Sequence, residues 1–271
     1  MEVLHAVFAA PFLDMADDPV FFLEVVIGGL MSGVMYSLVA LGFVLIFKAS
    51  GIFNFSQGVL ALFAALTLVG LMTGTMPFSL QKVLPEFPPI IAIALTILVM
   101  IGIAFLIERI VLRPLVNQSD MITFMSTIGI AFVLEGVGDT MWGSDVKVLD
   151  IGIPSGNWVI GEMYIQIFDL WATAIAGIMV IVLAVFFQKT RTGRALRAVA
   201  DDHQAALSVG IPLKTIWVVV WSVAGLVALV GGIMWGSKSG VQFSLSLIAL
   251  RALPVLIIGG LTSIPGAIIG G

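Results

Sequence analysis

Charged residues and cysteine are what this sequence has least of. Only 10% of its 271 residues are charged and none is cysteine, whereas 60% are hydrophobic. Because soluble domains carry about 25% charged residues, the exterior of this chain suits hydrocarbon better than water. The lack of cysteine excludes a disulfide framework and a thiolate metal site. With only two histidines in addition, we expect no metal centre.

Five apolar segments are long enough to cross a bilayer as helices, which takes about 20 apolar residues each. They are Phe22–Phe47, Phe87–Ile107, Met121–Trp142, Leu170–Phe187 and Thr215–Gly236. The sequence therefore predicts an all-α fold. We expect residues 1–271 to form a single domain, a polytopic bundle of transmembrane helices.

Two further apolar stretches predict broken or re-entrant helices. Ala49–Gln81 contains no charged residue, and at about 1.5 Å per residue it would reach roughly 50 Å across a core about 30 Å thick. We expect an irregular or half-helical segment over Ser50–Gln57, with Ser50-Gly51 and Gly58 as break points, and then a span from Gly58 to Met72. The second stretch, Ser239–Gly271, is interrupted by Arg251, Pro254, Gly259-Gly260 and Pro265-Gly266.

The basic residues predict an orientation, because cytoplasmic loops are enriched in Lys and Arg. Lys48 follows the first span, Arg109 and Arg113 lie between two later spans, and five more basic residues lie within 188–214. All eight can face the cytoplasm. We expect the membrane to be a bacterial inner (plasma) membrane. Residues 1–21 are then an external N-terminal segment, and 188–214 form a cytoplasmic loop. The long outer loop Gly143–Asp169 either contacts a partner or is a solvated connector.

A polar cluster stands inside the broken stretch. Asn54, Ser56 and Gln57 lie between Gly51 and Gly58 in otherwise apolar sequence. Non-helical backbone at membrane depth occurs only where it is buried in protein or lines a wet cavity, and broken helices surround many transporter sites. These side chains are candidates for lining a solute pathway. The alternative is a polar loop at the inner surface, next to Lys48.

Two charged residues are further candidates for the pathway. Glu135 lies within the span Met121–Trp142, with Asp139 on the same helical face at i+4. A charge at mid-membrane costs about 2.5–3.5 kcal/mol on insertion scales, so it favours the bundle interior and a partner. Arg251 is the available cation, and we hypothesise a Glu135–Arg251 pair.

The cytoplasmic loop contains a helical pattern over Ala195–Ser208, ended by Gly210 and Pro212. Leu196 and Val199 contribute to its apolar face, and charged residues flank it. A loop needed only for topology would be shorter. The pattern predicts a helix that docks on another protein or lies on the bilayer.

No catalytic or nucleotide-binding motif accompanies these features. The chain has no G-x-x-x-x-G-K-[ST] loop and no arrangement of nucleophile and base above chance. We therefore expect no enzymatic activity in this chain. If ATP drives transport, the ATPase is another chain.

Three groups of segments resemble the permease subunits of branched-chain and hydrophobic amino-acid ABC importers. One runs from Gly28 to Gly42 and on into GIFNFSQG at 51–58, with Ser37 and Ser56 where that family usually has alanine. Another is the pattern from Thr127-Ile128-Gly129 through Leu134-Glu135 to Trp142-Gly143. The third begins at TGRALRA, 192–198, and resumes at IGGLTSIPGA, 258–267, which is the most specific match.

The resemblance implies partners and roles. It implies a second related permease subunit, two ATPase subunits that bind ATP-Mg, and an external solute-binding protein, with no cofactor on this chain and no nucleic acid. It also implies that the segment Ala195–Ile211 couples to an ATPase. The coupling residues expected from this are Arg194, Arg197, Ala198, Asp201, Asp202 and Gly210.

Several functional alternatives remain open from the sequence. The resemblance implies import of branched-chain or other hydrophobic amino acids, while similar systems carry urea, short amides or aromatic carboxylates. An ion-coupled secondary transporter or channel using Glu135 and Arg251 is a second class. A membrane scaffold is a third.

Overall fold

The computed structural model describes residues 15, 18–75, 85–115, 118–154, 156–201, 206, 208, 210–211 and 213–271. In these residues five helices are long and apolar enough to cross a membrane, and their spans are Pro19–Ser50, Pro89–Leu115, Asp120–Trp142, Ile167–Lys189 and Thr215–Ser239. Each contains most or all of one of the five predicted spans. The expected all-α polytopic bundle is confirmed.

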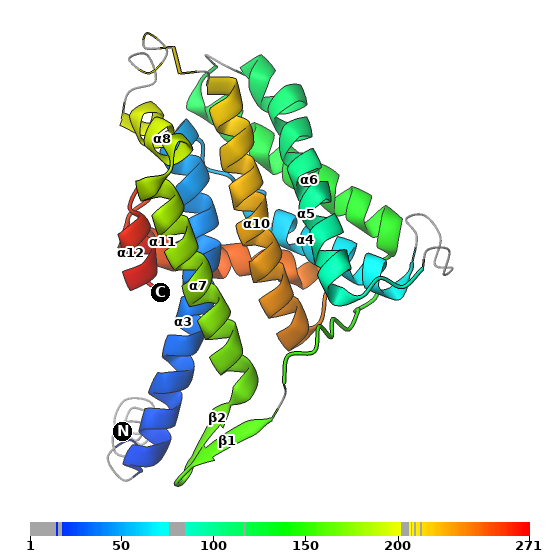
Figure 1. Cartoon of the computed structure of the whole chain (residues 1–271), viewed down its shortest axis with the longest axis vertical. Helices are drawn as coiled ribbons and strands as arrows, with labels where there is room; N and C mark the ends of the chain where they lie inside the picture. The colour runs from blue at the N-terminus through cyan, green and yellow to red at the C-terminus, as the bar shows by residue number, and fades with distance from the viewer. Residues whose placement is uncertain are drawn as a thin grey trace, which may run out of the picture.

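The bundle has an inner and an outer set of helices (Figure 1). In each of α3 (Pro19–Ser50) and α10 (Leu213–Ser239), 67% of the residues in an 18-residue apolar stretch are buried. In the equivalent stretches of the spans formed by α5 (Pro89–Leu106), α6 (Asp120–Trp142) and α7 (Ile167–Lys189), only 28% of the residues are buried. The outer three helices expose side chains such as Ile90, Val133 and Ile178, which suit contact with lipid.

The predicted break after the first span is confirmed. Helix α3 ends at Ser50, where Gly51 adopts a left-handed backbone with φ 69° and donates its N–H to the carbonyl of Phe47 at 2.8 Å. Residues 51–56 are not helical, and α4 then runs from Gln57 to Thr73. All of α4 from Gln57 to Gly70 is buried, because it packs against α10, α6 and α5 in the middle of the bundle.

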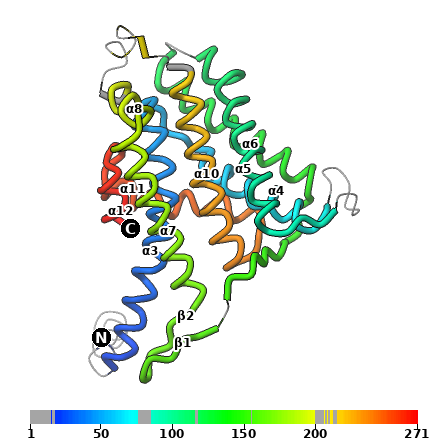
Figure 2. Tube along the Cα trace, viewed as in Figure 1, coloured from blue at the N-terminus to red at the C-terminus, as the bar shows by residue number. Residues whose placement is uncertain are grey.

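The C-terminal stretch breaks at fewer points than its sequence indicates. It forms a short 3₁₀ helix η3 (Phe243–Leu247), then α11 (Ile248–Gly259) and α12 (Ile264–Ile269). The helical backbone of α11 continues through Arg251 and Pro254 and stops at Gly260, which has φ 90°. Figure 2 shows α11 crossing the bundle at a steep angle to the long helices, with α12 beside α3.

One end of the bundle carries a β-hairpin that the sequence analysis did not predict. Strand β1 (Asn157–Ile160) pairs antiparallel with β2 (Met163–Gln166) around a turn containing Gly161, which has φ 66°. The hairpin leans on α3, where the N–H of Tyr164 donates to Glu24 Oε2 at 3.3 Å. At the same end, Lys238 of α10 forms an ion pair with Asp169 of α7 at 2.6 Å.

The other end of the bundle carries α8 (Arg191–Asp201). The C-terminal end of α3 lies beside it, and the continuation of α5 reaches the same end of the bundle (Figure 1). That continuation consists of a π-helix η1 (Ile107–Leu112) and a 3₁₀ turn η2 (Arg113–Leu115). The basic residues that were predicted to share one membrane side therefore lie at one end, opposite the hairpin.

Candidate functional site

The non-helical segment after α3 is held by its own polar side chains. Asn54 Oδ1 accepts from Ser56 N–H at 3.1 Å and from Ser56 Oγ at 2.6 Å. Asn54 Nδ2 donates to Gln57 Oε1 at 3.3 Å. All three side chains are fully buried. Because unpaired buried polar groups cost about 1–3 kcal/mol each, these bonds are what permit an irregular backbone inside the bundle.

A threonine of α6 pairs with the backbone of the same segment. Thr127 Oγ1 accepts the N–H of Phe55 at 3.0 Å. The hydroxyl also lies within donor distance of two carbonyl oxygens, 2.8 Å from that of Phe124 in its own helix and 3.2 Å from that of Phe53. This one fully buried hydroxyl is thus within hydrogen-bond distance of backbone groups on both sides of Asn54. Thr127 was not predicted as a site residue, and its place in the Thr127-Ile128-Gly129 pattern was the available signal.

Gln57 ties the start of α4 to two neighbouring helices. Its Nε2 donates to the carbonyl of Ala224 in α10 at 3.3 Å. On the other side Gly42 of α3 lies so close that a Cβ there would overlap the Gln57 amide. Residues 54–57 are therefore locked between α3, α6 and α10, and Asn54, Ser56 and Gln57 act first as a structural clamp.

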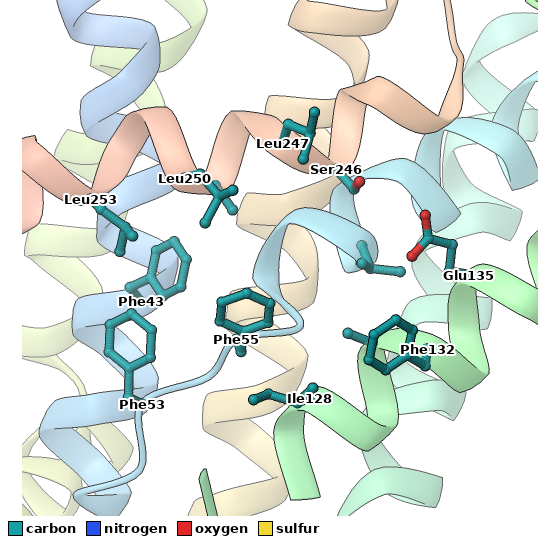
Figure 3. A pocket seen from close by; sticks show the side chains of 13 residues that line it. Phe43, Phe53, Phe55, Ile128, Phe132, Glu135, Ser246, Leu247, Leu250 and Leu253 are labelled. Atoms are coloured by element: carbon teal, nitrogen blue, oxygen red, sulfur yellow. The ribbon is translucent and has the colours of Figure 1, made fainter. Parts of the chain in front are cut away.

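The clamp leaves two phenylalanine side chains of the segment to line a cavity (Figure 3). The cavity has a volume of about 170 Å³. Phe53 and Phe55 face it from the segment, Ile128 and Phe132 from α6, and aliphatic side chains from α11, namely Leu250 and Leu253. A leucine- and phenylalanine-lined cavity of about 150 Å³ in another protein takes up benzene. This one has room for a branched aliphatic side chain.

Glu135 stands at the polar edge of this cavity, close to Ser246 (Figure 3). It also lines a second, wide-open cavity of about 510 Å³ at the surface, together with Asp139, Ser144 and Gln242. That cavity is polar and lies beside the chain that leads toward β1. A half-buried carboxylate thus separates a polar cavity from an apolar one.

The hypothesised Glu135–Arg251 pair is wrong. Both residues are described, and no ion pair joins them. Arg251 is exposed on α11 and lines neither cavity. The steep crossing of α11 through the bundle, which the sequence does not reveal, directs the two side chains to different places. Of the five residues predicted for the pathway, Glu135 alone lines these two cavities.

One fully buried carboxylate was missed by sequence reasoning. Glu108 in η1 is fully buried and accepts two hydrogen bonds from Arg113, at 3.0 Å to Nη2 and 3.3 Å to Nε. The wider π-helical turn is what brings residues five apart together. Sequence reasoning used Arg113 only as a topology signal, although Glu108 at the end of an apolar span was itself unusual.

The α8 segment begins earlier than predicted, and much of the predicted helix after Asp201 lies outside the described residues. The helix begins at Arg191, four residues before Ala195, because Thr190 Oγ1 caps it by accepting the N–H of Gly193 at 2.9 Å. Leu196 and Val199 are buried, as expected from the apolar face.

The predicted coupling residues fall into three groups. Arg194, Arg197, Ala198 and Gly210 are exposed. Asp201 ends α8 and only its backbone is described. Asp202 lies outside the described residues.

Comparison with known proteins decides what kind of chain carries this site. The model of the family described as the permease component of branched-chain amino acid transport systems matches residues 25–271. The chain belongs to this permease family.

Relatives of the permease occur in bacteria and archaea. The high-affinity branched-chain amino acid transport system permease protein LivH of Escherichia coli K12 is 28% identical, over 95% of this chain and 85% of that protein. BraD of Pseudomonas aeruginosa, with the same description, is 27% identical over 92% and 83%. A probable LivH of Methanocaldococcus jannaschii is 27% identical over 90% and 76%. No solved structure matches the permease at a significant level.

Family membership sets the level at which function is established. The permease is a multi-pass inner-membrane protein and a permease subunit of an ABC transporter complex. Its clamp, cavity and Glu135 all lie within the matched residues.

Proposed function

We propose that the permease moves branched-chain or other hydrophobic amino acids into the cytoplasm through the two cavities that meet at Glu135. The observation that carries the proposal is the change in lining at that residue, polar on one side and aromatic or aliphatic on the other. An amino acid with an apolar side chain is likewise polar at one end and apolar at the other. Its charged backbone groups suit the polar cavity and its side chain suits the cavity beside Phe55.

Glu135 is the natural contact for the ammonium group of such a solute. Among the residues that line these two cavities, only Glu135 lines both, and it is the single ionisable group of the apolar one. A carboxylate favours an ammonium over neutral solutes such as urea or short amides. Aromatic carboxylates, which lack an ammonium, would be repelled.

The exposed face of α8 is the proposed docking surface for an ATPase subunit. Leu196 and Val199 anchor the helix on the bundle, while Arg194 and Ala198 face outward. Because α8 packs on α3 and α7, a displacement of α8 reaches helices beside the broken segment. In this proposal separate ATPase chains bind ATP-Mg, and nucleotide shifts the bundle by favouring one of its states.

The hairpin end is the proposed external side. The concentration of basic residues at the α8 end supports a cytoplasmic location for that end, and residues 1–21 and the hairpin would then lie outside. The hairpin exposes Trp158 and Tyr164, and this end would receive solute from a binding protein. A second, related permease subunit completes the membrane part of the proposed complex.

The test is ATP-driven uptake of radiolabelled leucine by the complete complex in proteoliposomes. We expect Glu135→Gln to reduce uptake by about tenfold, which corresponds to one charge-assisted hydrogen bond. Asp145→Asn is the matched control, because Asp145 is an exposed carboxylate that lines neither cavity. Wild-type uptake by the Glu135 variant would contradict the route. Uptake driven by a proton or sodium gradient without ATP would favour a secondary transporter instead.

A further inference from the structure

A basic cavity lies at the α8 end of the bundle, away from the proposed solute route. It has a volume of about 220 Å³ and is formed by the last turns of α3 and α7 together with α8 and α12. Lys48, Gln188 and Arg197 form its polar wall. Its apolar wall includes Phe187 and Ile268.

The two cations of this cavity are not neutralised by the described side chains. Lys48 is half-buried at the end of α3, and no described carboxylate pairs with it. Arg197 donates to the carbonyl of Gln188 at 3.4 Å, which turns its guanidinium toward α7, and it too forms no ion pair with a described carboxylate. No described acidic residue lines the cavity. Two positive charges thus share one recess without a counter-charge from the described part of the chain.

The apolar wall continues from the cavity along α12. Figure 1 shows α12 beside α3 and closer than α8 to the middle of the bundle. Ile268 is 38% exposed and its neighbour Ile269 is 85% exposed. The cations therefore lie at the α8 end of the bundle, and the exposed isoleucines beside them are suited to contact with lipid tails.

We propose that this cavity binds the phosphate headgroup of an anionic phospholipid from the leaflet at the α8 end. Lys48 and Arg197 would hold the phosphate oxygens by charge-assisted hydrogen bonds. One acyl chain would lie along Ile268 and Ile269. Basic recesses between transmembrane helices are typical sites for anionic lipid headgroups. A free phosphate ion would use the cations but not the apolar wall.

The experiment measures phosphatidylglycerol retained by the full-length permease. The protein is reconstituted in phosphatidylcholine nanodiscs containing a minor fraction of phosphatidylglycerol, released into mild detergent and examined by native mass spectrometry. We expect Lys48→Gln to retain about fivefold less phosphatidylglycerol than wild type, the usual effect of one basic residue near an anionic surface. Lys48→Arg keeps the charge and should retain it.

The control is Lys189→Gln, which removes an exposed cation near the same membrane level but outside the cavity. Equal losses in the Lys48→Gln and Lys189→Gln variants would mean non-specific attraction and overturn the proposal.

A second measurement adds inorganic phosphate to the lipid-free protein and compares its binding with that of the lipid. Binding of phosphate as strong as that of the lipid would also overturn the proposal. If Lys48→Gln does not assemble, Arg197→Gln tests the same recess and should show the same selective loss.

Discussion

Two breaks in the described apolar stretches of this permease, one after α3 and one between α11 and α12, are held by different interactions. The first, after α3, is held by polar side chains, because Asn54 accepts the backbone N–H of Ser56 and Thr127 accepts that of Phe55. The second, between α11 and α12, is held by glycines. Gly259 and Gly266 approach so closely that a Cβ on either would overlap the backbone of the other.

The difference has a functional consequence. Side-chain bonding fixes residues 54–57 while leaving Phe53 and Phe55 to line a cavity. Because glycines have no side chains that could line a cavity, the contact between Gly259 and Gly266 at the second break contributes only to helix packing. It places α12 against α3, where Ser37 Oγ donates to the carbonyl of Ile268 at 3.3 Å. We infer that the first break belongs to the transport site and the second supports the scaffold.

The largest effect is expected from removing the centre of the clamp. Asn54→Leu keeps the approximate size of the side chain but leaves Ser56 N–H, Ser56 Oγ and Gln57 Oε1 without their partner. Each buried orphan costs about 1–3 kcal/mol, so we expect a loss of at least about 3 kcal/mol and poor assembly. Thermal unfolding in detergent measures this loss.

A matched control keeps this result specific to the clamp. Thr140→Val removes a hydroxyl that bonds only within α6, at an exposed position. It should unfold within a degree or two of wild type. Equal losses for the two variants would show that the Asn54 bonds have no special weight.

The glycine contact is expected to give the next largest effect. Gly266→Ala inserts a methyl group against the Gly259 carbonyl, and backbone cannot yield as a flexible side chain does. Overpacking of this kind costs about 1–3 kcal/mol, and we expect the upper part of that range. The effect should appear in stability with uptake per folded complex unchanged. Gly129→Ala has open space around it and should be neutral or slightly stabilising. A loss of uptake without a loss of stability would overturn the division between the two breaks.

The third effect separates backbone pairing from packing at the first break. Thr127→Val keeps the shape of the side chain but removes the hydroxyl that accepts from Phe55 N–H. One unpaired buried amide predicts a loss of about 1–3 kcal/mol, and the freed segment should also lower leucine uptake. Thr127→Ser should restore both. Thr123→Val, one turn earlier, removes a hydroxyl that bonds only to its own helix and should leave uptake at the wild-type level.

Sequence reasoning anticipated the first break better than the second. The first follows from arithmetic, since the charge-free stretch from Ala49 exceeds the thickness of a bilayer. Its position followed from Gly51, which does adopt the left-handed backbone. In the second stretch Arg251 and Pro254 resembled interruptions, but α11 continues through both. Pro254 is tolerated there because neighbouring helices can compensate for one missing hydrogen bond.

The site itself was only partly predictable, because its contacts join residues far apart in the chain. Asn54 and Gln57 were identifiable as polar residues in an apolar stretch, but their lack of exposure depends on α3, α6 and α10 packing around them. Glu135 was identifiable by its charge. That Arg251 faces elsewhere depends on the direction of α11, and that Thr127 meets Phe55 depends on α6 lying beside the segment. Periodicity carries no information on such crossings.

The smallest effect tests whether the second break depends on any side chain. Ser263 caps α12 by accepting the N–H of Gly266 at 3.0 Å. Loss of such a cap costs about 0.5–2 kcal/mol, so Ser263→Ala should lower the unfolding temperature less than Gly266→Ala, and Ser263→Thr should keep wild-type stability. If the cap variant were as damaging as Gly266→Ala, the second break would also depend on a polar side chain, and the contrast with Asn54 would be one of degree. If it is mild, the close approach of the glycines is what holds α12 on α3.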